Sequence, residues 1–194
     1  MSRALIAAAA LALAAPAYPA TVAFSGTQTN DTPPPGPSPL CGVGRLLISF
    51  NPGNAISTGQ SNFGAFASSQ QHCLTPPGTY DDGVFDYAFE AGDMFFGTYS
   101  GMLSPSEVEG VLNNAIELVV TGGTGRFLGA TGVINGVGTL DRRVPRTVSE
   151  LTLSGTLDLP AVPEPATWGM MILGLGGVGA ALRLRTAGRA AASA

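Results

Sequence analysis

Short runs of alternating apolar and polar residues, broken by glycine and proline, fill the middle of this chain and limit the folds open to it. In residues 84–90, Phe85, Tyr87 and Phe89 lie on one face of an extended strand. After a turn, residues 94–99 run back, so a β-hairpin is expected here. The three aromatic side chains would line an apolar cavity or form part of the core.

Other segments repeat this pattern of short strands separated by turns. We expect these strands at residues 45–50, 62–67, 116–120, 132–140 and 147–159. They are rich in Val, Thr, Leu and Gly and are regularly spaced. The pattern therefore predicts a mainly β fold, either a small antiparallel β-barrel or a sandwich.

One segment departs from the strand pattern. Residues 104–107, Ser-Pro-Ser-Glu, form a capping box with proline at the first helical position. A short helix that reaches about residue 113 is expected there, and a loop insertion is the alternative.

The N-terminus has the features of an export signal. A short positive segment precedes an apolar stretch at residues 4–15, which is too short for a stable membrane span. The Ala-Pro-Ala sequence that ends at Ala17 fits a cleavage site. We therefore expect a signal peptide over residues 1–17, a mature chain that begins at Tyr18, and passage through the Sec export machinery. Cleavage after Ala20 is the second choice.

The exported body divides into two parts. Residues 18–40 include a proline-rich stretch and are expected to form an extended segment before an antiparallel β domain over residues 41–160. Cys41 and Cys73 are the only cysteines, and in an exported protein such a pair indicates one disulfide. Closing a loop of about 30 residues would stabilise the fold by about 3 kcal/mol. Two free buried thiols are the alternative.

The C-terminal end combines three features in a fixed order. Pro163, Glu164 and Pro165 come first, and Trp168 lies near the start of an uncharged run at residues 166–182. A helix over this run would span roughly 25 Å, the short end of what a bilayer core requires, so a single transmembrane helix is predicted. A basic stop follows at residues 183–189, with Arg183, Arg185 and Arg189. The positive-inside bias places the C-terminus in the cytoplasm. An ordinary anchor with a proline linker would give the same pattern.

This tail, with its motif at residues 163–168, resembles the PEP-CTERM sorting tail of Gram-negative bacteria in its PEPxxW variety. The resemblance extends over residues 161–189 and implies handling by an exosortase, a membrane transpeptidase. It implies a precursor held transiently in the inner membrane, then cut near the motif and delivered to the cell surface or the extracellular matrix. There, exopolysaccharide would be a partner. Two features differ from the commonest tails: Gly169 follows the tryptophan, and the chain continues past the arginines to Ala194.

A second resemblance concerns the body and covers less of it. Residues 97–101, 120–132 and 136–140 are rich in glycine and threonine. They are similar to bacterial secreted β-barrels related to dirigent proteins and allene oxide cyclases. This resemblance implies a barrel and does not imply a reaction.

Charge and composition argue against several classes of function. Between residues 18 and 162 the chain has 12 acidic residues and 5 arginines, and it contains no lysine. An acidic surface argues against nucleic-acid binding, which requires a basic patch. His72 is the only histidine, so neither a multi-histidine metal site nor a hydrolase triad is expected.

One glycine-rich segment, residues 119–129, imitates the dinucleotide-binding turn of short-chain dehydrogenases. Leu128 stands where that turn needs its last glycine, and the residues that follow are poor helix formers. We interpret the segment as a β-turn with Arg126 exposed and Phe127 packed inward, and we expect no cofactor. The expected function is that of a non-enzymatic surface protein. A barrel that binds a small apolar ligand and a cyclase-like enzyme are the alternatives.

Overall fold

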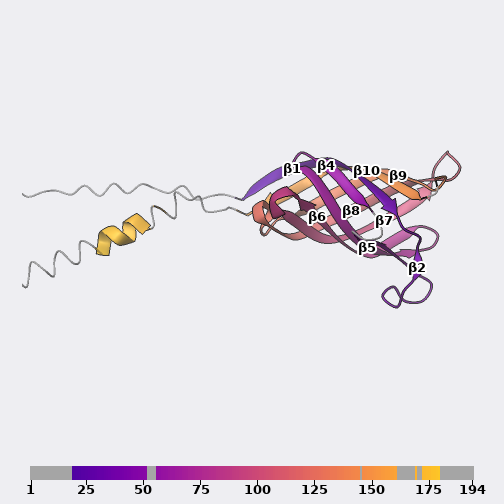
Figure 1. Ribbon diagram of the computed structural model, residues 1–194, viewed down its shortest axis with the longest axis horizontal. Coiled ribbons are helices and arrows are strands. Elements are labelled where there is room, and N and C mark those ends of the chain that lie inside the picture. The colour runs from indigo at the N-terminus through magenta and orange to yellow at the C-terminus, as the bar shows by residue number, and fades with distance from the viewer. Residues whose placement is uncertain (1–18, 52–55, 145, 161–168, 170–171, 180–194) are drawn as a thin grey trace, which may run out of the picture. The chain divides into compact units, whose positions relative to one another are not determined.

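The barrel unit, Pro19–Pro160, contains every strand of the computed structural model (Figure 1). The structure describes residues 19–51, 56–144, 146–160, 169 and 172–179. The whole sheet and both buried apolar clusters lie within the barrel unit. It therefore has its own core, as an independently folding domain requires.

Eight antiparallel strands close into a barrel, because β5 pairs with both β4 and β6 and so joins the two ends of the sheet. Closure leaves no long open edge that another chain could pair with. In the order in which they pair around the barrel, the strands are β1 (Ala20–Thr32), β10 (Thr147–Leu159), β9 (Thr131–Asp141), β8 (Val111–Thr124), β7 (Met94–Pro105), β6 (Thr79–Phe89), β5 (Gly64–Thr75) and β4 (Ser57–Ser61).

Two further strands extend the wall at one end of the barrel. Strand β3 (Leu46–Phe50) pairs with residues 70–74 of β5, on the edge that β4 uses nearer the start of β5. The two-residue strand β2 (Gly36–Pro37) pairs with β3. A loop of about a dozen residues between β1 and β3 is therefore fastened along the outside of this end.

The mainly β architecture and the predicted hairpin are confirmed, and of the two expected forms the fold is the barrel. Strands β6 and β7 pair from Ala88 and Met94, on either side of a short 3₁₀ turn, η1 (Glu90–Gly92). Strand β10 has the bounds that the sequence predicts. The alternation of apolar and polar residues is a reliable guide here because long strands such as β6, β8 and β10 have one buried and one exposed face.

The helix expected after residue 104 is wrong. Strand β7 continues to Pro105, and β8 begins at Val111. Ser106 does not cap a helix. Its hydroxyl donates a hydrogen bond to the carbonyl of Val111 (2.9 Å) and accepts one from the amide of Val108 (3.1 Å), which closes a turn. Serine offers the backbone this alternative wherever strand pairing outweighs local helix propensity.

The expected domain boundary at residue 41 is also wrong. Residues 20–32 form β1, which pairs along its whole length with β10, from Ala20 opposite Leu159 to Thr32 opposite Thr147. The inward positions of β1 include polar side chains, so its strand pattern is hard to recognise in the sequence. The proline-rich stretch is only the exit from this strand.

One half of the barrel interior is filled with aromatic rings. This aromatic half consists of Phe24, Phe66, Phe85, Tyr87, Phe89, Phe95 and Phe127, all buried. The rings of Phe66 and Tyr87 stack at 4.4 Å, and those of Phe95 and Phe127 meet edge to face at 5.2 Å. Burying one such ring stabilises the fold by about 1.5–3 kcal/mol, with a further gain from ring geometry. The predicted trio Phe85, Tyr87 and Phe89 therefore forms core, and the alternative that it lines a cavity is wrong.

The turn between β8 and β9 closes this half of the barrel. Phe127, in the 3₁₀ turn η2 (Gly125–Phe127), is fully buried, while Arg126 remains exposed, as the sequence predicts. The guanidinium of Arg126 lies 4.9 Å from the centre of the Phe127 ring and pairs with Asp93 at 3.1 Å. A cation over an aromatic face attracts the ring quadrupole, so this arginine covers the aromatic core.

Candidate functional site

The other half of the barrel interior is lined with polar side chains. This polar half consists of His72 on β5, Tyr80 on β6, Tyr99 on β7, Asn114 on β8 and Ser149 on β10, and each is at most 8% exposed. Five strands therefore converge on one point inside the barrel. Buried polar groups are costly unless they are paired, so their partners decide what the site can do.

Hydrogen bonds fix these side chains to one another. The Nδ1 atom of His72 lies 2.6 Å from the hydroxyl of Tyr99. The hydroxyl of Tyr80 donates to Oδ1 of Asn114 (2.6 Å), whose Nδ2 donates to Oγ of Ser149 (3.1 Å). The rings of His72 and Tyr80 face each other at 4.5 Å. Such a network holds each group in one orientation.

A second network pairs Tyr87 of the aromatic half with polar side chains of β1 and β4. The hydroxyl of Tyr87 donates to Oε1 of Gln28 on β1. The Nε2 atom of Gln28 donates to Oδ1 of Asn30 (2.6 Å) and to Oγ of Ser57 (3.0 Å). All four residues are buried. Tyr87 thus packs its ring among phenylalanines and pairs its hydroxyl in the polar network, which is how buried tyrosines are normally accommodated.

Burial keeps the titratable members of the polar half uncharged near neutral pH. It lowers the pKa of His72 to about 4, so the imidazole is neutral at pH 7. Burial likewise raises the pKa of Tyr80 and of Tyr99 above the ordinary value for a phenol. A general acid or base works best with a pKa near the operating pH. The site therefore offers fixed donors and acceptors, and no group poised for proton transfer at neutral pH.

Two polar atoms at this end are buried without a hydrogen-bond partner among the residues that the structure describes. They are Nε2 of Gln70 and Oγ1 of Thr32. Both residues line an internal cavity of about 50 Å³ next to His72. That volume accommodates water, and an organic ligand requires several hundred Å³.

The cavity adjoins a larger mouth pocket at the same end of the barrel. The mouth pocket has a volume of about 390 Å³, and it shares Thr32, Ile48, Leu103 and Leu140 with the internal cavity. Pro33, Pro34 and Pro35, which follow β1, form one of its walls. The first and last strands, β1 and β10, have their outer chain ends, Ala20 and Leu159, at the opposite end of the barrel.

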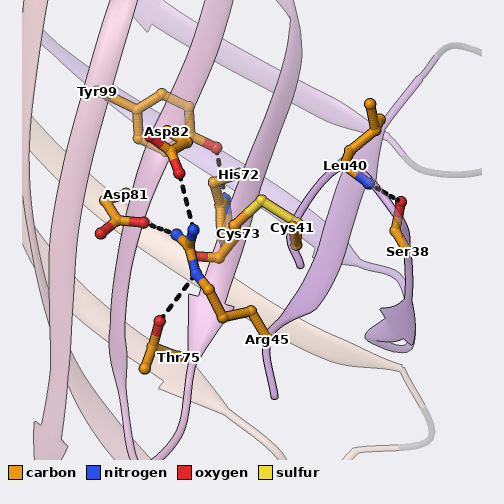
Figure 2. The surroundings of a disulfide bond; sticks show 10 residues. All are labelled: Ser38, Leu40, Cys41, Arg45, His72, Cys73, Thr75, Asp81, Asp82 and Tyr99. Atoms are coloured by element: carbon orange, nitrogen blue, oxygen red, sulfur yellow. Dashed lines mark hydrogen bonds and ion pairs between the residues drawn. A yellow bond between two sulfur atoms is a disulfide. The ribbon is translucent and has the colours of Figure 1, made fainter. Parts of the chain in front are cut away.

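The disulfide between Cys41 and Cys73 is confirmed. Figure 2 shows Arg45 beside it, paired with Asp81 and Asp82 and donating a hydrogen bond to Thr75 (3.1 Å). These contacts fasten the loop that follows the mouth-pocket prolines onto β5 and β6. The proline wall is therefore anchored on both sides, by β1 before it and by the disulfide after it.

The sequence did not identify the polar half. Its signal lies in β5, where Phe66, Ser68, Gln70 and His72 occupy every second position and all point inward. Polar residues in phase with an apolar face indicate a buried polar site. That phase can be read only once the direction of Phe66 is known.

The residues of the predicted sorting signal lie outside those that the structure describes. This holds for the motif residues Pro163, Glu164, Pro165 and Trp168, for the basic stop Arg183, Arg185 and Arg189, and for Ala17 and Tyr18 at the expected signal-peptide cleavage site. Within the tail, residues 172–179 are helical. Among the residues that the structure describes, no helix is long and apolar enough to cross a membrane.

Comparison with known proteins identifies the tail and leaves the barrel unassigned. Residues 161–185 match the model of the PEP-CTERM protein-sorting motif. No curated protein and no solved structure matches the chain. The motif implies export to the cell surface and processing by an exosortase. The chain therefore carries, at residues 161–185, the sorting motif that defines PEP-CTERM proteins.

Proposed function

We propose that this chain is an exported, non-enzymatic protein of the cell surface or extracellular matrix, sorted and processed through its C-terminal tail. The observation that carries the proposal is the PEP-CTERM motif at residues 161–185. A signal peptide over residues 1–17 starts export. The uncharged run at residues 166–182 then holds the precursor at the inner membrane until an exosortase-like transpeptidase cuts near Pro163, Glu164 and Pro165.

The barrel interior supports a role without catalysis. Aromatic rings fill one half of it, and the internal cavity in the other half holds about 50 Å³. The one histidine is buried, and its pKa is lowered to about 4. A stable, disulfide-linked barrel suits a protein that must persist outside the cell, where disulfides remain intact.

The test replaces Pro163, Glu164 and Pro165 with alanine in the native host, with an epitope tag in the barrel. Membrane association should remain, because residues 166–182 are unchanged. Release should stop, so the full-length form accumulates in the inner-membrane fraction. If wild type and variant are released equally, the motif is only a linker and the proposal fails.

A second variant separates cleavage from retention. Replacing Arg183, Arg185 and Arg189 with glutamine leaves the motif intact but removes the positive charges that orient a membrane segment. This variant should be lost from the membrane fraction before any cut is made. The two variants therefore fail at different steps, which fractionation and the size of the tagged product distinguish.

A further inference from the structure

The mouth pocket combines apolar walls with two arginines, Arg142 and Arg146, of which Arg146 is paired with Asp31. Leucine, isoleucine and proline side chains from six segments form its walls, among them Ile48, Leu74, Leu103, Leu112 and Leu140. Arg142 lines the same pocket from the turn between β9 and β10. Its volume of about 390 Å³ lies within the range of small-molecule sites.

Arg142 is the exception among the arginines of the barrel unit. Four of the five pair with a carboxylate: Arg45 with Asp81 and Asp82, Arg126 with Asp93, Arg143 with Asp141, and Arg146 with Asp31. Arg142 makes no ion pair with any residue that the structure describes, although Glu107 and Glu109 lie in the neighbouring turn between β7 and β8. In a domain with more than twice as many acids as arginines, an unpaired guanidinium beside an apolar pocket is available to an external anion.

The floor of the pocket also has unused hydrogen-bonding capacity. Gln70 is 94% buried, its Nε2 has no partner among the described residues, and it lines the cavity beneath the mouth. Oγ1 of Thr32, at the junction of cavity and mouth, has none either. A buried polar group without a partner is costly in a finished core, so these atoms point to water or a ligand inside this end of the barrel.

We propose that the mouth pocket binds a small amphipathic anion. Its apolar body lies against the leucine and proline walls, and its single acidic group pairs with the guanidinium of Arg142. The apolar walls supply most of the affinity, and the arginine selects for the charge. This site is independent of the sorting tail, so either proposal can fail without the other.

The test uses two fluorescent probes that differ by one acidic group, on the barrel unit. 8-Anilinonaphthalene-1-sulfonate carries the sulfonate, and N-phenyl-1-naphthylamine is the same molecule without it. Arg142→Gln should weaken binding of the sulfonate probe about tenfold, the effect of losing one charge-assisted interaction, and change the neutral probe less than about twofold.

The chain offers a matched control in the next residue. Arg143→Gln removes the same charge, but Arg143 pairs with Asp141 at 2.6 Å and does not line the pocket. It should leave the affinity for both probes unchanged. Leu112→Trp fills the mouth and should abolish binding of both, which shows that the probes occupy this pocket.

Several outcomes would overturn the proposal. One is that the sulfonate probe does not bind wild type. Another is that Arg142→Gln and Arg143→Gln weaken binding of that probe equally. A third is that a folded Leu112→Trp variant binds both probes as wild type does. Far-UV circular dichroism establishes that each variant is folded. If Leu112→Trp does not fold, the comparison of the two adjacent arginine variants decides the question alone, since both positions are exposed.

Discussion

The two halves of the barrel interior are packed by different means. In the aromatic half, ring contacts at 4.4–6.2 Å fill the space, and its only hydrogen-bonding group is the hydroxyl of Tyr87. In the polar half, each side chain depends on a named partner, and a cavity of about 50 Å³ remains. Apolar side chains are stabilised by close packing, which does not depend on their orientation. Hydrogen bonds require each polar side chain to hold one orientation, and this prevents the side chains from filling all the space between them. The aromatic half therefore stabilises the fold, and the polar half keeps one end of it open.

The largest effect should come from a ring at the centre of the aromatic half. Phe95→Ala removes a fully buried side chain that contacts Phe24, Phe85, Tyr87 and Phe127, and it should lower the free energy of unfolding by about 3–5 kcal/mol. Urea unfolding of the barrel unit measures the loss. The matched surface change Val137→Ala should cost less than about 1 kcal/mol. A similarly small cost for Phe95→Ala would mean that the aromatic half does not carry the stability.

The disulfide should come next, because it fastens the loop beside the polar half. Replacing both Cys41 and Cys73 with serine should lower the free energy of unfolding by about 3 kcal/mol, since the unfolded chain regains the freedom of the closed loop. Adding reductant to wild type in the same urea titration should reproduce the loss. Equal stability with and without the disulfide would show that the loop is held by Arg45 and its carboxylate partners alone.

The polar half should respond to pH. Its buried histidine, His72, has a pKa of about 4 in the folded state, below the value of 6.5 in the unfolded chain, so the unfolded state binds the proton first. The contribution of His72 to the free energy of unfolding is complete above pH 6.5 and is lost as the pH falls from 6.5 to 4. At pH 5 the free energy of unfolding should be lower by about 2 kcal/mol. His72→Gln should remove this part of the pH dependence in urea titrations at pH 7 and pH 5. An identical loss in wild type and variant would show that the histidine is solvated.

The smallest effect should come from Gln70, whose Nε2 lacks a partner among the described residues. Gln70→Leu should change the free energy of unfolding by no more than about 1 kcal/mol, because no hydrogen bond of that atom is lost. Asn114→Leu is the control, because it also replaces a buried amide side chain with leucine. It leaves Tyr80 and Ser149 without their partner and should cost about 1–3 kcal/mol. If both changes cost the same, internal water completes the pairing of Gln70 and the two halves are equally well packed.

The sequence predicts the parts of the fold in which alternation and composition agree. Strand β10 and the hairpin of β6 and β7 have clear apolar faces, and the direction of Phe127 follows from its turn. The two cysteines pair as their exported context suggests. The tail is recognised because its three features follow one another along the chain, so no fold is needed to bring them together.

The rest depends on contacts between distant segments. Strand β1 carries Gln28 and Asn30 on its inward face, so its burial is apparent only from its pairing with β10. The helix expected after residue 104 loses to strand pairing, which no local pattern shows. The polar half contains residues from five strands. Among the described residues, Arg142 can be recognised as the arginine without an ion pair only when the ion pairs of the other arginines are known.

The pairing of the first strand with the last has a mechanical consequence. Strands β1 and β10 are antiparallel and begin and end side by side, with Ala20 opposite Leu159 and a hydrogen bond from Thr21 to Asp158 (2.5 Å) at the same end. A pull applied between the two ends of the barrel unit would load this ladder one rung at a time and peel it open. A pull between the C-terminal end and the opposite end of the barrel, where the mouth pocket lies, would load many hydrogen-bonded pairs of the two strands at once in shear. The barrel should therefore resist traction far better when it is held by its rim than when it is held by its own N-terminus.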